Sequence, residues 1–413
     1  MQRFFGLPPS GELNQETLAV MKKPRCGLSD VEHFGDTIRW KKRTLSYRLA
    51  GSTLPMSASR AHKVLRAAWK LWSSVTPMKF RKRNRKEADI VISFYKGDHE
   101  DNAPFDGNGG VLGHAFLPGP GIGGDVHFDA DEEWSFNHSG VNLLAVAAHE
   151  FGHALGLPHS SDPGAIMYPA YNPNNELQLS FQDVKDIQRL YGVSPSFSLL
   201  VSKKPPPRTP EKCDPDLSFD AVTRLQQETV FFKDRFMWRK HPQFDKTGIT
   251  LINSLWPDTV PSYLDAVYEN VEGNFILFFK GHQYWKLRQL TLSEGFPRNI
   301  SDFGFPSRIK SVDAALHFRN EHYTVFFTGH ECWRYNEQQS VMEGSPMLIK
   351  QQWPGIPSPV DAAVFYEGFV HFFRGNLHYK YDLISERVIA ILSANDLLEC
   401  KMEENNQTAT ERR

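Results

Sequence analysis

The spacing of hydrophobic residues predicts the secondary structure of the N-terminal half of the chain. Over residues 57–75 they recur at intervals of three or four, which predicts an amphipathic helix. Segments 44–49, 89–94 and 111–116 look like strands separated by loops rich in Gly, Asp and Asn. Further helices are expected over 141–156 and 180–192, the latter with Asp183 placed for a capping box. A mixed α+β domain over residues 37–192 follows from this pattern.

The C-terminal half repeats a pattern of about 45 residues. Each unit contains Asp-Ala followed by Ala or Val, then a double Phe, then an aromatic residue followed by Lys or Arg. The repeated aspartates, at spacings of 45, 48 and 48, are Asp220, Asp265, Asp313 and Asp361. Four such units with strand-like segments predict an all-β four-bladed propeller over residues 213–400.

Composition and charge limit the remaining possibilities. Residues 193–212 hold five prolines and predict a semi-rigid linker, while residues 401–413 form a polar tail. The 47 Lys and Arg residues balance 48 Asp and Glu residues, so no overall field attracts nucleic acid or an anionic membrane. No apolar run is long enough for a membrane-spanning helix. The basic run 81–86 could bind a glycosaminoglycan, but a solvated loop between strands is the favoured interpretation.

The clearest chemical motif is HExxHxxGxxH at residues 149–159. On a helix His149 and His153 share one face, and a turn at Gly156 returns the chain so that His159 adds a third nitrogen. Three imidazoles leave one tetrahedral position open, which is typical of a catalytic zinc whose water Glu150 can deprotonate. The alternative is a helix with buried structural histidines. Met167, eight residues after His159, fits a Met-turn beneath the metal and weakens that alternative.

These motifs resemble those of the matrix metalloproteinases, the matrixins among the metzincins, over essentially the whole chain. The segment Pro-Arg-Cys-Gly-Leu-Ser-Asp at 24–30 resembles the family's cysteine switch, and the repeats resemble its hemopexin-like propeller. The resemblance implies an α+β metzincin catalytic domain, with a twisted mixed sheet and three helices, before the propeller. Residues 1–36 would be the C-terminal part of a propeptide, truncated at its start, in which Cys26 binds the open zinc position.

We expect Arg25 to favour the thiolate form of Cys26. The alternative is an ordinary free or disulfide-bonded cysteine. Ser29 stands where the family usually has Pro, which predicts a looser latch.

The resemblance also implies a second, structural zinc and at least two calcium ions. The structural zinc would be held by His99, Asp101, His114 and His127. One calcium site would use Asp106, Gly107, Gly109, Val111, Asp129 and Glu132, and another Asp89, Gly121, Gly123 and Asp125. Solvated acidic turns are the alternative to the calcium sites.

The resemblance gives expectations for substrate binding and for the cysteines. Residues 167–171, including Pro169 and Tyr171, resemble the outer wall of the S1′ pocket, and Ala145 stands where a larger residue often limits its depth. Strand 111–115 would pair with the substrate. Cys213 and Cys400 would form the disulfide that joins the first and last blades. Cys332 is interpreted as a buried free thiol.

The sequence therefore predicts a secreted zinc endopeptidase of extracellular proteins, made as a latent zymogen. Activation is expected by proteolysis near residues 33–37 and not by a furin-like convertase. Expected partners are protein substrates, tissue inhibitors of metalloproteinases and activating proteases, without nucleic acid or a membrane span, and the chain is expected to be a monomer. Three Asn-x-Ser/Thr sequons, at Asn137, Asn299 and Asn406, are compatible with secretion. The alternative is a latched, matrix-binding scaffold with little proteolytic activity.

Overall fold

The computed structural model describes residues 2, 5, 7, 10–30, 38–50, 55–84, 87–135, 140–171, 177–194, 197, 205–243 and 247–400. The chain divides into two compact units. The first contains residues 1–209 with 253–255, and the second contains residues 210–252 with 256–413. No helix in the described part of the chain combines the length and apolarity that crossing a membrane requires.

A six-stranded mixed sheet forms one layer of the first unit. Its strands are β1 (Arg25–Cys26), β2 (Thr44–Leu49), β3 (Lys79–Lys82), β4 (Ile90–Tyr95), β5 (Val111–Ala115) and β6 (Val126–Asp129). They lie in the order β1-β5-β6-β4-β2-β3, and only β5 and β6 pair antiparallel. Two short strands, β7 (Trp134–Ser135) and β8 (Val141–Asn142), pair separately. The predicted mixed sheet is confirmed.

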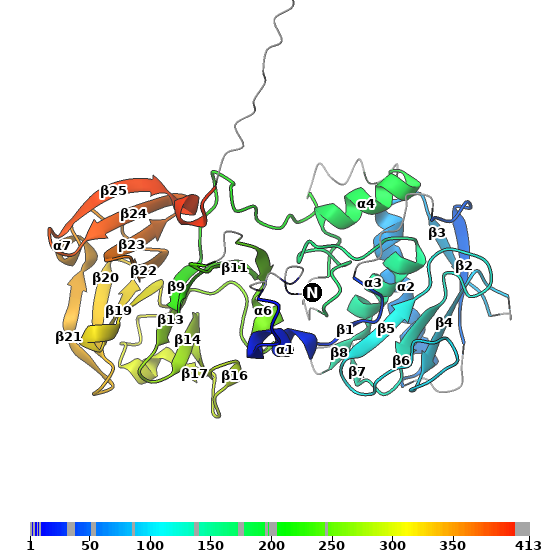
Figure 1. Ribbon diagram of the computed structural model, residues 1–413, viewed down its shortest axis with the longest axis horizontal. Coiled ribbons are helices and arrows are strands. Elements are labelled where there is room, and N and C mark those ends of the chain that lie inside the picture. Colours follow the sequence, from blue (N-terminus) through cyan, green and yellow to red (C-terminus); the bar gives the residue numbers. More distant parts are fainter. Residues whose placement is uncertain are drawn as a thin grey trace, which may run out of the picture. The chain divides into compact units, whose positions relative to one another are not determined.

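The first unit also contains helices. They are α1 (Gln15–Met21), α2 (Ala58–Val75), α3 (Leu143–Ala154) and α4 (Phe181–Tyr191), and Figure 1 shows α2 and α3 side by side. Trp69 of α2 stacks on Phe151 of α3 with ring centroids 3.7 Å apart. Trp72 donates its indole N–H to Ala148 O at 2.9 Å. The three helices predicted after residue 37 are therefore present, and their contact holds α3 at a fixed height above the sheet.

Two local expectations need correction. The basic run begins in a strand and not in a loop, because Arg81 and Lys82 pair with Ser46 and Tyr47 as part of β3. The helix expected from residue 141 begins at Leu143, after the two residues of β8. In both places the pairing partner is distant in sequence, so hydrophobic spacing alone does not reveal it.

Four antiparallel sheets form the second unit. Their strands are β9 (Ala221–Leu225), β10 (Glu228–Lys233), β11 (Phe236–Lys240) and β12 (Ile249–Leu251); β13 (Ala266–Asn270), β14 (Phe275–Lys280), β15 (Gln283–Arg288), β16 (Thr291–Leu292) and β17 (Arg298–Asn299); β18 (Ala314–Phe318), β19 (Tyr323–Thr328), β20 (Glu331–Asn336) and β21 (Val341–Leu348); β22 (Ala362–Tyr366), β23 (Phe369–Arg374), β24 (Leu377–Asp382) and β25 (Arg387–Ser393). Short helices α6 (Ile252–Leu255), η1 (Ile300–Phe303), η2 (Arg319–Glu321), α7 (Ile349–Gln352) and η3 (Ala394–Leu398) lie between or after them. The innermost strands β9, β13, β18 and β22 contact one another in a closed ring, which confirms the four-bladed propeller.

The repeated double Phe explains how the blades pack. Successive side chains of a strand point to opposite faces, so each pair sends one ring to each neighbouring blade. Phe279 lies 5.7 Å from Phe326, and Phe327 lies 5.6 Å from Phe372, measured between ring centroids. All eight of these repeated Phe side chains are fully buried. The motif therefore supplies the apolar contact across each blade interface.

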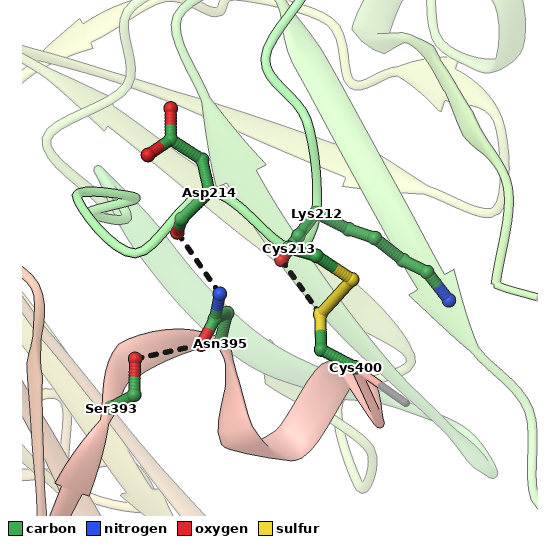
Figure 2. The surroundings of a disulfide bond; sticks show 6 residues. All are labelled: Lys212, Cys213, Asp214, Ser393, Asn395 and Cys400. Atoms are coloured by element: carbon green, nitrogen blue, oxygen red, sulfur yellow. Dashed lines mark hydrogen bonds between the residues drawn. A yellow bond between two sulfur atoms is a disulfide. The ribbon is translucent and has the colours of Figure 1, made fainter. Parts of the chain in front are cut away.

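A disulfide joins Cys213 to Cys400 and links the start of the first blade to the end of η3 (Figure 2). Beside it, Asn395 donates its side-chain amide to Asp214 O at 3.0 Å. Closing a loop of this length reduces the entropy of the unfolded chain. In the chain-entropy model this stabilises the folded state by about 5 kcal/mol. Cys332 is free and buried, as expected, and burial raises the pKa of its thiol to about 11.

Candidate functional site

Helix α3 carries four of the predicted site residues, all of them buried. Asn142 caps the helix by accepting a hydrogen bond from Leu144 N at 2.9 Å. After Ala154 the chain turns at Gly156, which has a φ of 99°. A Cβ atom there would lie 2.3 Å from Ile38 O, so only glycine fits this turn. The turn returns the chain to His159.

The structure gathers four residues with ligand-type atoms at this turn. One ligand-type atom from each of Cys26, His149, His153 and His159 lies within 4.8 Å of the others. His149 Nδ1 donates to Ile166 O and His153 Nδ1 donates to Leu157 O, both at 2.7 Å. Both Nε2 atoms therefore carry lone pairs, and they face each other at 3.1 Å. Two facing acceptors at this distance fit a site built around a cation.

Burial keeps these imidazoles neutral, which is the form that binds metal. Burial and then the neighbouring His159 lower the pKa of His149 to about 3. Burial followed by the two other imidazoles lowers the pKa of His153 well below its ordinary value. His159 Nδ1 lies 3.1 Å from Asp30 Oδ1 but outside hydrogen-bonding geometry, and its Nε2 has no partner among the described residues. Three imidazole nitrogens and one sulfur suit zinc.

Strand β1 brings Cys26 to the three histidines. Cys26 N donates to Pro169 O at 3.0 Å, and Gly27 N donates to Gly113 O at 2.9 Å. A Cβ atom at Gly27 would lie 2.8 Å from Val111 Cγ1, so the segment fits closely along β5. Segment 24–27 thus lies between β5 and residues 167–171, in the cleft where substrate was expected.

Arg25 acts on the Cys26 thiol in the expected direction, by lowering its pKa, but larger effects oppose it. Burial, then the Glu150 carboxylate, raises the pKa of the Cys26 thiol well above its ordinary value, and Arg25 has the smallest of the opposing effects. The Arg25 guanidinium instead pairs with Asp30 at 2.6 Å. A carboxylate in the pocket outweighs a guanidinium already neutralised by another residue. A bound cation is therefore the remaining source of a thiolate.

Glu150 lies beside Cys26 at the centre of the cluster. Its side chain is fully buried, and neither carboxylate oxygen has a hydrogen-bond partner of full geometry among the described residues. Burial raises the pKa of Glu150 to about 8, while contact with the Cys26 thiol acts in the opposite direction. Burying a carboxylate without full hydrogen bonds reduces the stability of the fold. Such a group is typical of a catalytic residue.

Met167 lies beneath the histidines, and a buried carboxylate holds its turn. Asp183 accepts hydrogen bonds from Ile166 N at 2.8 Å and Met167 N at 3.1 Å. It also completes the capping box with Ser180, whose backbone N donates to it at 2.8 Å. Sequence reasoning identified Asp183 only as a cap. No sequence signal gives its second contact, because the Met167 turn is brought to it by the fold.

The predicted substrate-binding residues lie on α3 and on the segment that bonds to residues 24–27. Ala145 is buried in the first turn of α3, four residues before His149. Tyr171 accepts a hydrogen bond from Asn142 N on its hydroxyl at 2.8 Å, and its own N donates to Pro24 O at 2.8 Å. Pro169 contributes the carbonyl that binds Cys26 N. These contacts fix the wall segment to the start of α3.

The second predicted zinc set also converges. The Asp101 Oδ2 atom lies 2.7 Å from His99 Nε2, 2.8 Å from His114 Nε2 and 2.8 Å from His127 Nδ1. Burial alone would raise the pKa of Asp101, but hydrogen bonds from Ala103 N and the imidazoles lower it to about 2. Burial lowers the pKa of His127 to about 4. The four side chains are almost fully enclosed, which suits a closed structural site.

Carboxylates gather at the first predicted calcium loop. Gly109 N donates to Glu132 Oε1 at 2.6 Å, Gly107 N to Asp129 Oδ2 at 3.3 Å, and Val111 N to Asp106 Oδ1 at 2.9 Å. Burial, then the neighbouring carboxylates, raises the pKa of Glu132. Like charges held this close favour a bound cation.

The residues of the second predicted calcium site are engaged locally. Asp89 Oδ2 accepts from Ser46 N at 2.7 Å, and the other oxygen pairs with Lys42. Asp125 Oδ1 accepts from Val91 N at 2.8 Å. Gly121, with a φ of 69°, and Gly123 belong to the turn that precedes Asp125. A calcium ion here stays a prediction.

Comparisons with known proteins agree with this geometry. Residues 39–192 match the family model described as matrixin, and residues 219–259, 264–307 and 312–358 match the hemopexin repeat. The chain is 44% identical over 407 residues to neutrophil collagenase of Homo sapiens, which covers 97% of this chain and 86% of that protein. With the same coverage it is 45% identical to interstitial collagenase of Bos taurus and 43% identical to matrix metalloproteinase-18 of Xenopus laevis. The similarity extends across both units.

Proposed function

The chain belongs to the matrixin family of metalloendopeptidases, and we propose that His149, His153 and His159 hold its catalytic zinc and that Glu150 is its general base. The observation that carries this proposal is the pair of Nε2 lone pairs facing each other at 3.1 Å, because a cation held by both rings would favour that geometry. Ile166 O and Leu157 O fix the tautomers that aim these lone pairs inward.

Each residue has a distinct part in peptide hydrolysis. A bound zinc acts as a Lewis acid toward the substrate carbonyl and makes water acidic enough to lose a proton near neutral pH. Glu150 accepts that proton on a carboxylate oxygen and passes it to the leaving amine nitrogen. Burial raises the pKa of Glu150, which makes its ionised carboxylate a stronger base. Burial lowers the pKa values of His149 and His153 and so favours their neutral, metal-binding form.

Latency is the second part of the proposal. Cys26 lies among the three histidines, and its segment occupies the edge of β5. A substrate that pairs with β5 needs that edge free. We therefore expect an inactive zymogen until this segment leaves. The expected cleavage region, residues 33–37, lies outside the described residues.

The substrate class and the extracellular location are further parts of the proposal. Two of the named relatives are collagenases, and the four-bladed unit offers a second surface for large proteins. We propose a secreted enzyme that cleaves extracellular-matrix proteins, collagen among them, and that tissue inhibitors and activating proteases regulate. Ala145 beneath the cleft favours a deep S1′ pocket for bulky apolar residues. A peptide series that cleaves best with Ala after the scissile bond, and not with Leu or Phe, would refute this pocket.

The remaining metal sites and domain bounds complete the proposal. His99, Asp101, His114 and His127 would hold a structural zinc, and the two loops described above would each hold calcium. The propeptide would comprise residues 1–36, the catalytic domain 37–192, the linker 193–212 and the propeller 213–400. The boundary between the two compact units, after residue 209, falls within the proposed linker.

The test compares hydrolysis of a quenched peptide by three proteins. These are the untreated chain, the chain after mercurial treatment or trimming through Asp36, and the trimmed Glu150→Gln variant. We expect activity only in the treated wild-type chain, with zinc content unchanged by the substitution. Trimmed Glu133→Gln, which alters an exposed carboxylate outside the site, should stay active. Equal rates in all samples would support the rival function, a latched matrix-binding scaffold, which the close fit of segment 24–27 favours.

A further inference from the structure

Positive charge is concentrated in one part of the chain. Residues 37–86 contain fifteen Lys and Arg residues and no Asp or Glu. The other 363 residues therefore hold 32 Lys and Arg against all 48 Asp and Glu, taken from totals of 47 and 48 over 413 residues. A net charge of −1 for the whole chain hides this separation. A local field of one sign is a basis for binding an oppositely charged polymer.

The fold brings two parts of this region together. On α2, polar and basic residues recur at spacings of one, three and four, which places His62, Lys63, Arg66 and Lys70 along one face of the helix. The strand that follows α2 is β3, which carries Arg81 and Lys82 and forms one edge of the sheet. Helix face and edge strand therefore face a common space.

That space is an open groove with a volume of about 1050 Å³. Its basic lining comprises His62, Lys63, Arg66, Lys70, Arg81 and Lys82, and no acidic residue lines it. Rings form the floor, where Trp69 stacks on Phe80 with centroids 4.3 Å apart and lies 5.8 Å from Tyr47. The cations thus stand on both walls above a rigid aromatic base.

The charges on the walls are not neutralised within the described part of the chain. Lys63, Arg66, Lys70, Arg81 and Lys82 are exposed, and no ion pair or hydrogen bond joins their side chains to another described residue. Their field reaches the groove itself. Burial lowers the pKa of His62, and the charge of Lys82 lowers it further. Arg66 similarly acts on the Tyr47 hydroxyl from the opposite wall.

We propose that this groove binds a sulfated glycosaminoglycan chain. Sulfate groups along a polysaccharide match a row of cations on two walls, and the release of counterions drives such binding. A single-stranded nucleic acid fits less well, because Trp69 and Tyr47 are buried and offer no face for base stacking. The choice of an extracellular polyanion rests on the proposed secreted function.

The groove is compatible with proteolysis. In the sheet order β1-β5-β6-β4-β2-β3, the groove lies at the β3 edge, whereas the cleft lies along β5 near the opposite edge. A bound polysaccharide therefore does not occupy the cleft. It would hold the enzyme on proteoglycan-rich matrix while the cleft stays open to substrate.

The test measures binding of the full chain to a heparin oligosaccharide at several salt concentrations. The groove variant is Lys63→Gln with Lys70→Gln and Lys82→Gln. Its matched control is Lys185→Gln with Lys310→Gln and Lys350→Gln, which removes the same charge from exposed lysines elsewhere. We expect the groove variant to bind about tenfold or more weakly, with a shallower salt dependence, and the control to bind like the wild type.

Three further measurements decide between outcomes. Chemically desulfated heparin should bind weakly, and a single-stranded DNA should bind less tightly than heparin at equal ionic strength. Equal heparin binding by both variants, or tighter binding of DNA, overturns the proposal. Peptide hydrolysis by the activated groove variant should match the wild type. Loss of hydrolysis in activated wild type with heparin binding intact would count against the proposed protease function alone.

Discussion

Gly152 and Met167 approach each other so closely that no side chain fits between them. A Cβ atom added to Gly152 would lie 2.2 Å from Met167 Sδ and 3.0 Å from Trp72 Cζ2. Gly152 lies on α3 between Glu150 and His153, and Asp183 holds the Met167 turn from below. The helix that carries the histidines therefore rests directly on that turn.

Gly152→Ala should destabilise the catalytic unit. Alanine favours a helix over glycine by about 1 kcal/mol, but overpacking a rigid core costs about 1–3 kcal/mol, and here Trp72 is fully buried. We expect a net loss in the free energy of unfolding, measured by urea titration, and a lower rate of peptide hydrolysis. Gly119→Ala is the control, since its Cβ would meet only ordinary contacts beyond 3.8 Å. Wild-type stability in both variants would mean that Met167 relaxes freely.

Cys26→Ala should produce a chain that hydrolyses peptide without any activating treatment. The substitution removes the sulfur from the histidine cluster and leaves Glu150 and the three imidazoles in place. Cys332→Ala changes the other free buried cysteine and should remain latent until activated. The comparison is made by assaying freshly purified proteins before and after mercurial treatment. A latent Cys26→Ala variant would contradict the assigned role of Cys26.

Calcium should stabilise the wild-type chain more than a Glu132→Gln variant. Glu132 is buried beside Asp106 and Asp129, so a bound cation offsets their mutual repulsion. At a calcium concentration one hundred times the Kd, a ligand that binds only the folded state contributes about 2.7 kcal/mol. Thermal unfolding with and without calcium measures the effect. The exposed neighbour gives the control Glu133→Gln, which should respond to calcium like the wild type.

The propeller should lose stability in acid because of His371 and His378. Their rings are buried with Nδ1 of His371 2.6 Å from Nε2 of His378, and His371 Nε2 donates to Tyr366 O at 3.0 Å. His378 therefore donates to His371, and its own Nδ1 has no partner among the described residues. Burial lowers the pKa of His378 to about 3, and the charges of the neighbouring His371 and Lys380 act in the same direction.

The sign follows from proton binding. Below the unfolded pKa of about 6.5 the unfolded chain binds a proton that the folded propeller does not, so stability is full above that pH and falls as pH decreases toward 3. Between pH 7 and pH 5 the loss is on the order of 2 kcal/mol. Hydrogen exchange of peptides from β23 and β24, corrected for intrinsic pH dependence, measures it. His378→Gln should flatten this dependence, whereas the exposed control His330→Gln should not.

Residues that act through local chemistry were predictable from the sequence. The HExxHxxGxxH spacing gave the three histidines because helical geometry fixes which side chains share a face. The double Phe and the repeated Asp predicted the four blades, because each repeat must bury the same apolar surface against its neighbours. The capping box at Ser180 followed from its two residues alone.

Long-range pairing was not predictable in the same way. Strand β1 has two residues and carries no periodicity, so its pairing with β5 appears only in the fold. The same holds for β3. Its charged residues predict a loop, and only the pairing with β2 in the fold identifies them as a strand. Arg25 was assigned to Cys26 by adjacency, whereas its partner Asp30 lies five residues away across a turn. Contacts that depend on tertiary structure cannot be predicted from residues that are adjacent in sequence.

The bond between Cys213 and Cys400 makes the four blades a covalently closed circle. A protease that cuts one loop between blades opens this circle but releases no fragment, since both pieces remain attached through the bond. Such a nick would be invisible on a gel run without reducing agent and would yield two bands once the bond is reduced. The propeller can therefore be damaged at a loop and still leave every blade on the same molecule as the catalytic unit.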